Sequence, residues 1–558
     1  MLAVQEDDLE QHRPATEMAS TARRDLLATL AFFALALTGY LTFFTAHYSY
    51  DSVASGVLLY QWIASGHFAP LLHRYHVLYL PAAASAELFL RTIGVQVDPL
   101  TLLQALNAFC AAASVALYYR LMRAFELDSL LSAILTLLFG GGFSVWYYAT
   151  NGEPYPISWV FLILAFLTAA RMREGASALR SSVPGAWLGL GAAFHGTCLL
   201  ALPGLAVLSW PHARTRGGAR RIAGVIVAAG LVVGAPYAVR SLLTQRSDPA
   251  SGIAADTAAF AREEGWSRVP QLIDQWRGLA WSMAPTDWPS LPTSHPLVTR
   301  TASQGLLAAT LLPFLLLLGC ERGRRKAAIG AAVWFAVSFL FFSVYFAGSP
   351  KFAGYQWAPL LLLIGLALQH SGAHARVRLS ATAAFAALAC TTLVCSFDLA
   401  RRQTDPASNP HLARALAIAR LTEPNDLVVH LGRGENQYQK VYTPYFAARR
   451  SLVVERYFDP EHASVDQSMQ ALEARLATAT AGPGRIVALS DAIEPGASSR
   501  EFEKANGLQE GSLARFFAAY HPDLLAQDPA AGKLWLLTAP AEKGPQEIPR
   551  AAALTRWR

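Results

Sequence analysis

The sequence is poor in charge. Only 15% of its 558 residues are Asp, Glu, Lys or Arg, whereas 53% are hydrophobic. Soluble domains carry about 25% charged residues, so the shortfall argues against an ordinary soluble protein and for a membrane protein. The net charge of +7 fits arginine-rich cytoplasmic loops. No basic patch is interleaved with aromatic residues, so we expect no nucleic-acid partner.

Cysteine is scarce as well. The five cysteines all lie in apolar runs, and none is paired at a spacing typical of metal ligands: Cys110, Cys198, Cys320, Cys390 and Cys395. We therefore predict small buried side chains here, with neither a disulfide framework nor a zinc site. The sequence also lacks a clear internal repeat and any low-complexity segment, which argues against a solenoid or a disordered protein.

Long apolar runs, by contrast, are abundant. The first covers about 20 residues and suits a membrane-spanning helix better than a signal-peptide core. Nine runs are long enough to span: about 26–45, 100–119, 129–149, 156–171, 222–243, 303–320, 327–346, 354–369 and 378–397. The run at 184–210 is too long for one helix and short for two. The apolar stretch 77–90 is shorter and contains a proline, which suggests an interfacial segment.

The arginine-rich loops indicate on which side of the membrane each connection between helices lies. The positive-inside rule places these loops on the cytoplasmic side: 21–24, 120–125, 171–180, 212–221, 321–326 and 374–378. All six loops fall on the cytoplasmic side if 46–99 is one outer loop and 184–210 is a hairpin of two short helices. The prediction is about 11 membrane helices, with a cytoplasmic N-terminus. If 184–210 is a single tilted helix, every later segment changes side.

Three regions follow from this pattern. Residues 1–24 form a cytoplasmic N-terminal segment, residues 25–399 a transmembrane domain with outer loops 46–99 and 244–302, and residues 400–558 an extracytoplasmic domain. In the last region charge rises and long apolar runs stop. Short apolar strands at 425–432, 485–491 and 533–539 alternate with amphipathic helices at 411–421 and 466–479, which predicts an α/β fold.

Asp51 follows the first apolar run and is the first candidate for chemistry. The plainer interpretation is a solvated loop residue. The functional one is a general base that takes a proton from an acceptor hydroxyl. The stretch after it has apolar residues at helical spacing, at Val53, Val57, Tyr60 and Ala64, which predicts an interfacial helix that holds Asp51 at the membrane surface.

Four further stretches, two described here and two in the next paragraph, place polar residues on the same outer side. In LLHRYHVLYLP, His73, Arg74 and His76 could bind a phosphate at headgroup depth or serve as an interfacial anchor. Glu153 lies in the rigid turn NGEPYP and is either solvated, catalytic or the ligand of a divalent cation.

His195 lies inside the apolar run 184–210, and ionisable groups at membrane depth are functional by default; a hydrogen-bonded core histidine is the alternative. Lys351 begins a late helix, where it either snorkels to the interface or pairs with a lipid phosphate.

Taken together, these stretches resemble the GT-C superfamily of membrane glycosyltransferases, in particular its protein O-mannosyltransferase-like and lipid-A-modifying branches. The similarity covers roughly residues 25–370. It rests on YSYDSVASG, LLHRYHVLYLP, YATNGEPYPISW, GLGAAFHGTCLLALP and, more loosely, SPKFAGYQWAP. Two features differ from the family pattern: Asp51 has no adjacent glutamate, and RYHVLYLP has a single proline several residues after the histidine.

The resemblance implies a polyprenyl-phosphate-linked sugar as donor and a glycan, lipid or protein as acceptor. It implies an inverting reaction with Asp51 as base, with Glu153 as a second catalytic or cation-binding acid and Tyr155 at the substrate. Phosphate binding then falls to His73, Arg74, His76, His195 and Lys351. The resemblance makes no cofactor certain and leaves room for a divalent cation. The lack of a eukaryotic-looking retention signal favours a bacterial inner membrane, with the C-terminal domain extracytoplasmic.

Two other classes of function fit the same composition. A transporter or lipid flippase would need polar residues in mid-membrane, but here the polar groups gather on one side. A non-catalytic scaffold would depend on the C-terminal domain alone.

Overall fold

The structure is a computed structural model that describes residues 15–172, 177–210, 216–245, 266–283, 287–288, 291–292, 304–305, 325–370, 375–458 and 464–538. These residues divide into two compact units. The first comprises the described residues of Met1–Thr45 and Gly66–Arg402, and the second those of Ala46–Ser65 and Gln403–Arg558. The segment after the first long helix is thus grouped with the C-terminal residues.

The first unit is helical, which confirms the predicted fold class. Its helices are α2 (Ala15–Thr42), α4 (Tyr79–Thr92), α5 (Pro99–Ala124), α6 (Ser129–Gly141), α7 (Phe143–Ala149), α8 (Tyr155–Ala170), α9 (Ala178–Phe194), α10 (Leu202–Ser209), α11 (Arg216–Gln245), α13 (Leu272–Met283), α15 (Arg325–Val344), α16 (Ala353–His370) and α17 (Ala375–Gln403). Short 3₁₀ turns η1 (Ala69–Leu71), η2 (Gly196–Ala201) and η4 (Pro350–Phe352) join some of them, and β1 (Asp287–Trp288) pairs with β2 (Leu291–Pro292).

Among the described residues, six helical segments are long and apolar enough to cross a membrane: Ser20–Thr42, Pro99–Ala124, Gly218–Leu243, Arg325–Val344, Pro350–Gln369 and Ala375–Gln403. A seventh span results if α6 and α7, bent by 58°, count as one broken crossing. Helices α8 and η2–α10 are apolar but shorter. Nearly all of the predicted span 303–320, much of the loop 244–302 and the start of the N-terminal segment lie outside the described residues, so the total of about 11 stays a prediction.

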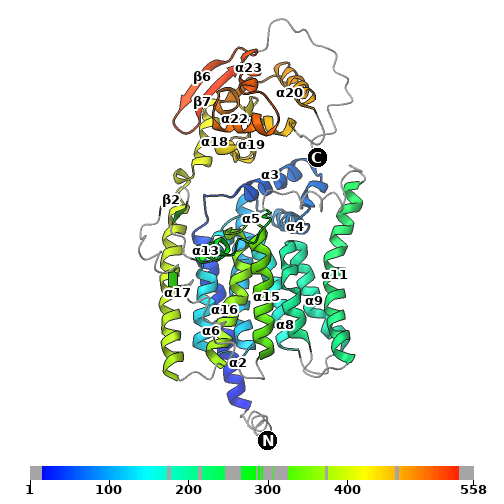
Figure 1. The fold of residues 1–558 in the computed structure, drawn as a ribbon, viewed down its shortest axis with the longest axis vertical. Coiled ribbons are helices and arrows are strands. Elements are labelled where there is room, and N and C mark those ends of the chain that lie inside the picture. Colours follow the sequence, from blue (N-terminus) through cyan, green and yellow to red (C-terminus); the bar gives the residue numbers. More distant parts are fainter. Residues whose placement is uncertain are drawn as a thin grey trace. The chain divides into compact units, whose positions relative to one another are not determined.

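The run 184–210 is broken at His195. Helix α9 ends at Phe194, His195 is extended, and η2 and α10 follow. Helices α8, α9 and α11 lie side by side (Figure 1). Gly185 and Gly189 of α9 face Val225 and Ala229 of α11 in the same order, so α9 and α11 run in the same direction. Since the chain must return between two parallel helices, the segment η2–α10 is the returning arm of a hairpin.

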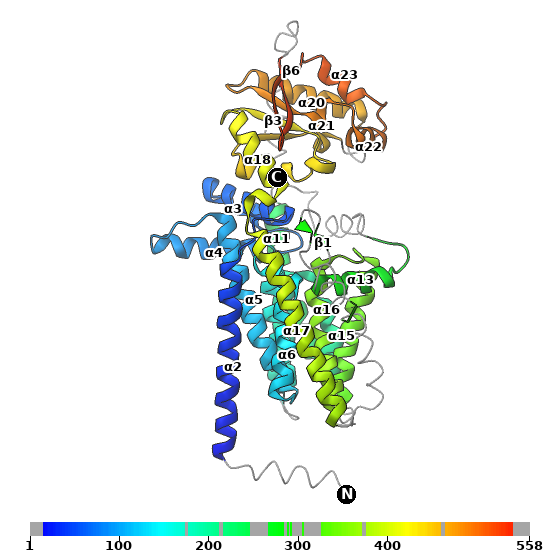
Figure 2. The same cartoon turned by 90° about the vertical axis from the view of Figure 1, so that its left-hand side faces the viewer.

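Two shorter helices cross the direction of the long ones, α4 and α13 (Figure 2). Helix α13 buries Gln275, which donates to Gln356 of α16 (3.0 Å) and accepts from the Gly348 amide (3.1 Å). At the end of the same helix, Ser282 accepts from the Trp357 indole (3.0 Å). These contacts fix the segment that leads into η4, where Lys351 lies.

The second unit is an α/β domain, as the sequence predicted. Its elements are α3 (Tyr50–Ser65), η5 (Pro406–Ser408), α18 (Pro410–Leu421), β3 (Leu427–His430), η6 (Gly434–Asn436), α19 (Gln439–Phe446), β4 (Arg450–Val453), η7 (Val454–Tyr457), α20 (Val465–Thr480), β5 (Ile486–Leu489), α21 (Ser490–Ile493), α22 (Ala497–Ala505), α23 (Ser512–Ala518), β6 (Asp523–Asp528) and β7 (Gly532–Leu537). The strand order is β4-β3-β5-β7-β6. Strands β4, β3 and β5 are parallel, and β7 and β6 form an antiparallel edge.

Both faces of this sheet are covered, which explains why its central strands read as continuous apolar runs. Alternate residues point to opposite sides of a strand. Leu427 and Val429 pack with α20, α22 and α23 on one face, whereas Val428 packs with α18 on the other. The predicted strands and amphipathic helices correspond to β3, β5, β7, α18 and α20, but β4, β6 and α19 were not predicted.

Helix α3 belongs to this second unit. The Tyr442 hydroxyl donates to the Tyr48 carbonyl (2.6 Å), the Asn409 amide donates to the Ala46 carbonyl (2.7 Å), and Gly56 lies against the Tyr445 ring. The helix predicted after Asp51 is therefore present, but its face differs from the predicted one. Val53 is buried, whereas Tyr60 is 62% exposed.

The close approach of α9 and α11 generates a stability prediction. A Cβ at Gly185 would lie 2.1 Å from the Val225 carbonyl oxygen, which is backbone and cannot turn aside. Glycines four apart allow such helix contacts in membranes. We expect Gly185→Ala to destabilise the protein by about 1–3 kcal/mol, measured by thermal unfolding in detergent. Gly230→Ala on α11 is the matched control, because nothing lies within 4 Å of its Cβ position. Equal melting temperatures for Gly185→Ala and Gly230→Ala would contradict the close packing of α9 on α11.

Candidate active site

The site is built on a short loop that is fixed to two helix ends. The buried Arg240 of α11 donates from Nε to the Leu72 carbonyl (2.9 Å), and the Leu78 amide donates to the Ala193 carbonyl near the end of α9 (3.2 Å). Between these points, Leu72, Val77 and Ala193 form a small apolar cluster. The loop 72–78 is thus held at both ends, and its histidines face the end of α9.

Three imidazole rings stack at this junction. The ring centroids of His73 and His76 lie 5.3 Å apart with an interplanar angle of 11°, and those of His76 and His195 lie 4.7 Å apart at 28°. His195 is 5% exposed, and its Nδ1 contacts the Thr197 hydroxyl (2.5 Å). The break in the hairpin therefore serves to present His195 to the loop.

Aromatic side chains enclose the stack. Tyr155 of α8 lies 4.6 Å from His195, centroid to centroid, and Tyr355 of α16 lies 5.6 Å away. The Tyr355 hydroxyl contacts the Ser158 hydroxyl (2.5 Å), and Phe352 closes another side at 6.2 Å from His195. Four segments far apart in sequence, residues 72–78, α8, the end of α9 and η4–α16, therefore build one wall.

Glu153 is buried beside this wall, with 1% of its surface exposed. Its turn is held by Asn107 of α5, whose amide donates to the carbonyls of Asn151 (2.6 Å) and Glu153 (2.5 Å). Burial raises the pKa of Tyr79, and the nearby Glu153 carboxylate raises it further. The sequence allowed a solvated turn acid, but the structure shows a buried one.

Electrostatics keep the middle imidazole neutral. Burial lowers the pKa of His76 well below its ordinary value, and the neighbouring His195 and His73 lower it further. The Phe194 carbonyl opposes this shift, and Lys351 adds a smaller lowering. Lys351 is therefore near enough to act on the stack. Its position in η4 is set by Ser349, whose hydroxyl accepts from the Lys351 amide (3.3 Å).

The predicted residues thus fall into two groups. His73, His76, His195, Tyr155 and Lys351 come together in the first unit with Glu153 close by, and Arg74 lies over the Tyr75 ring, 4.6 Å from its centroid.

Asp51 belongs to the second unit, where it is exposed in the first turn of α3. Burial raises the pKa of the adjacent Tyr50; the Arg456 guanidinium opposes this shift and the Asp51 carboxylate adds to it.

Sequence reasoning missed several members of the site. Arg240 holds the loop, and Tyr355 and Phe352 complete the wall. A signal existed for Arg240, because it is a lone charge at the end of the apolar run 222–243. Phe352 and Tyr355 lie in the stretch SPKFAGYQWAP, which had been used only to single out Lys351.

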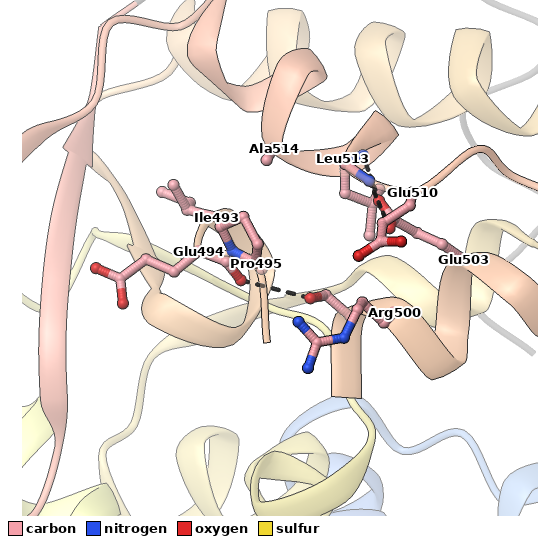
Figure 3. Close-up of a pocket in the computed structure, with 11 residues that line it drawn as sticks. Ile493, Glu494, Pro495, Arg500, Glu503, Glu510, Leu513 and Ala514 are labelled. Atoms are coloured by element: carbon pink, nitrogen blue, oxygen red, sulfur yellow. Dashed lines mark hydrogen bonds between the residues drawn. The ribbon is translucent and has the colours of Figure 1, made fainter. Parts of the chain in front are cut away.

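The other candidates are weaker. Among the described residues, no group of three or more His, Cys, Asp and Glu side chains is arranged to hold a metal ion. The second unit has a cavity of about 210 Å³ between α21, α22 and α23, with Glu503 and Glu510 on one side and Glu494 on the other (Figure 3). Glu503 accepts from the Gly511 and Leu513 amides, and Glu494 pairs with Lys533 (2.9 Å). Two of the three acids thus already serve the fold.

Known proteins resemble this chain in structure. A comparison with protein families finds no match, and a comparison with curated proteins finds none either. Among solved structures, ArnT from Cupriavidus metallidurans bound to undecaprenyl phosphate is 12% identical with a TM-score of 0.57, covering 93% of this chain and 99% of ArnT. Its apo form gives 14% identity and a TM-score of 0.56, over 95% of this chain and 100% of that one.

A third structure is the oligosaccharyltransferase AglB from Archaeoglobus fulgidus, in complex with an inhibitory peptide and a dolichol-phosphate. It is 13% identical with a TM-score of 0.50, covering 94% of this chain and 75% of AglB. The chain therefore shares the fold of ArnT and AglB, in agreement with the resemblance noted in the sequence.

The anchoring of the loop generates a prediction. Arg240→Met removes the charged donor to the Leu72 carbonyl, a hydrogen bond of a class worth about 1.5–3 kcal/mol. We expect the amides of the loop 72–78 to exchange with deuterium at least tenfold faster. Arg220→Met, an exposed arginine on the same helix, should leave that exchange unchanged. Unaltered exchange in Arg240→Met would show that the loop is held by other contacts.

Proposed function

We propose that the protein is a membrane glycosyltransferase that moves a sugar from a polyprenyl-phosphate donor to an acceptor on the extracytoplasmic face. The observation that carries this proposal is the cluster of His73, His76, His195 and Lys351 within a GT-C fold. The cluster gathers groups that can bind a phosphate. ArnT, whose fold this chain shares, was crystallised with undecaprenyl phosphate.

The chemistry of transfer explains why such a cluster is needed. Attack of an acceptor hydroxyl on the anomeric carbon breaks the bond from that carbon to the phosphate oxygen, and the electron pair stays on the phosphate. Negative charge develops on the leaving group, so preorganised cationic and hydrogen-bonding groups stabilise the transition state. In this proposal His73, Arg74, His76, His195 and Lys351 bind the phosphate, and Tyr155 lies at the substrate.

The base in this proposal is Asp51. It accepts the proton of the acceptor hydroxyl while the sugar inverts at its anomeric carbon. Its side chain is exposed in the first turn of α3, where an acceptor hydroxyl can reach it. Glu153 would bind the acceptor or a divalent cation. The sugar and the acceptor, whether a glycan, a lipid or a protein, are left open by this chemistry.

The proposed setting is the bacterial inner membrane. The lipid tail of the donor would stay in the bilayer between the long apolar helices, while its phosphate and sugar face water. The C-terminal α/β domain would then be extracytoplasmic and the N-terminus cytoplasmic, as the arginine distribution predicts.

The role of Asp51 is tested by Asp51→Asn. We expect sugar transfer from a panel of polyprenyl-phosphate sugars to fall at least about 100-fold, because general-base catalysis contributes about 10²–10⁴, while carrier binding and folding are kept. The matched control is Asp466→Asn, an exposed aspartate in the first turn of α20 in the same unit. Transfer at the wild-type rate by Asp51→Asn would exclude it as the base.

The phosphate site is tested by Lys351→Met. We expect undecaprenyl phosphate to bind about 10- to 100-fold more weakly, as a hydrogen bond to a charged group contributes about 1.5–3 kcal/mol, and the salt dependence of binding to diminish. Lys504→Met, an exposed lysine of α22, provides the comparison. Equal affinity of the two variants would remove Lys351 from the site.

A further inference from the structure

The histidine stack poses a problem of charge. Two imidazolium rings stacked face to face repel one another, and burial disfavours the charged form of each. His76 is the middle ring, between His73 and His195. The other groups that face it are Lys351, the Tyr75 ring of its own loop and the Phe194 carbonyl. Tyr155 lies against the far ring, His195. The charges around His76 are thus positive or neutral, which leaves it neutral when the site is empty.

The three rings differ in what their Nδ1 atoms contact. Nδ1 of His73 accepts from the Tyr75 amide (3.3 Å), and Nδ1 of His195 accepts from the Thr197 amide (3.4 Å). A proton added to either atom would break that bond. Nδ1 of His76 is buried and has no hydrogen-bond partner among the described residues. His76 is therefore the ring that can gain a proton without losing a contact.

The proposed reaction changes the charge at this place. The donor is a phosphodiester with one negative charge. When the bond from the anomeric carbon to oxygen breaks, the departing carrier is a phosphate monoester, whose second pKa is about 6, and it carries two negative charges above that pH. The added charge favours a protonated imidazole beside it.

We propose that His76 takes up one proton from solvent when the phosphate monoester of the carrier occupies the cluster. The site then presents one more positive charge to the dianionic product than to the donor, which carries a single negative charge. This inference rests on the proposed function. Protons and electrons balance in this step. The acceptor proton goes to the base, and the electron pair of the broken bond stays on the phosphate oxygen. The proton on Nδ1 of His76 comes from water. His76 thereby compensates the second charge of the leaving group.

The consequence is a pH dependence of product binding. A ligand whose binding takes up a proton binds more tightly as pH falls, by up to tenfold per pH unit. Uptake occurs at pH values between the lowered pKa of free His76 and the pKa of His76 in the complex, which the bound dianion raises, so the slope extends upward to that second pKa. Between pH 7 and 8.5 the monoester keeps its two charges, so a slope there reports on the protein. A phosphodiester should bind with little pH dependence.

The experiment is calorimetric binding of undecaprenyl phosphate to the full chain in detergent at pH 8, in two buffers with different ionisation enthalpies. We expect uptake of about one proton by the wild type and almost none by His76→Gln. The control His67→Gln changes an exposed histidine outside the stack and should match the wild type. In parallel, wild-type affinity is measured from pH 7 to 8.5 for undecaprenyl phosphate and for its methyl diester, which needs no variant.

The outcomes separate the two proposals. Absence of undecaprenyl phosphate binding to the wild type would overturn the proposed function and this inference together. Binding without proton uptake, or uptake that persists in His76→Gln, would overturn the inference and leave the function standing. Equal pH slopes for the monoester and the diester would also overturn it, even if His76→Gln fails to fold.

Discussion

The hydrogen bond from Arg240 to the Leu72 carbonyl is the constraint on which the site depends. A buried arginine is costly unless its donors are satisfied, and here it is satisfied by the backbone of the loop that carries His73 and His76. The bond from the Leu78 amide to the Ala193 carbonyl fixes the other end of the loop beside His195. Three histidines from two distant parts of the chain therefore stack, although neither the loop nor His195 after α9 is regular helix.

Histidine suits this position for a physical reason. A lysine or arginine in the middle of the stack would carry a permanent charge in a buried, aromatic setting, at a cost the fold would have to offset. An imidazole can remain neutral when the site is empty and become charged when an anion is near. The aromatic wall of Tyr155, Tyr355 and Phe352 keeps water from screening that change.

The segment after the first helix packs within the second unit. Helix α3 is bound to the α/β domain through Tyr442, Asn409 and the contact at Gly56, so Asp51 is positioned by residues from the C-terminal part of the chain. The chain shares this fold with the two ArnT structures at 12–14% identity.

The sequence by itself determined the membrane-helical class and the α/β character of the last region, because hydrophobic runs and strand patterns are local properties. It also predicted one site that contains Asp51, His73, Arg74, His76, Glu153, Tyr155, His195 and Lys351. The structure brings His73, His76, His195, Tyr155 and Lys351 together in the first unit, whereas Asp51 belongs to the second. Only the tertiary structure decided the stacking of the imidazoles, the burial of Glu153, the anchoring role of Arg240 and the place of α3. These depend on contacts between residues distant in the chain, which no local pattern encodes. Tyr60 illustrates the limit: helical spacing marked it as apolar-facing, but the packing of α3 on α19 turned it outward.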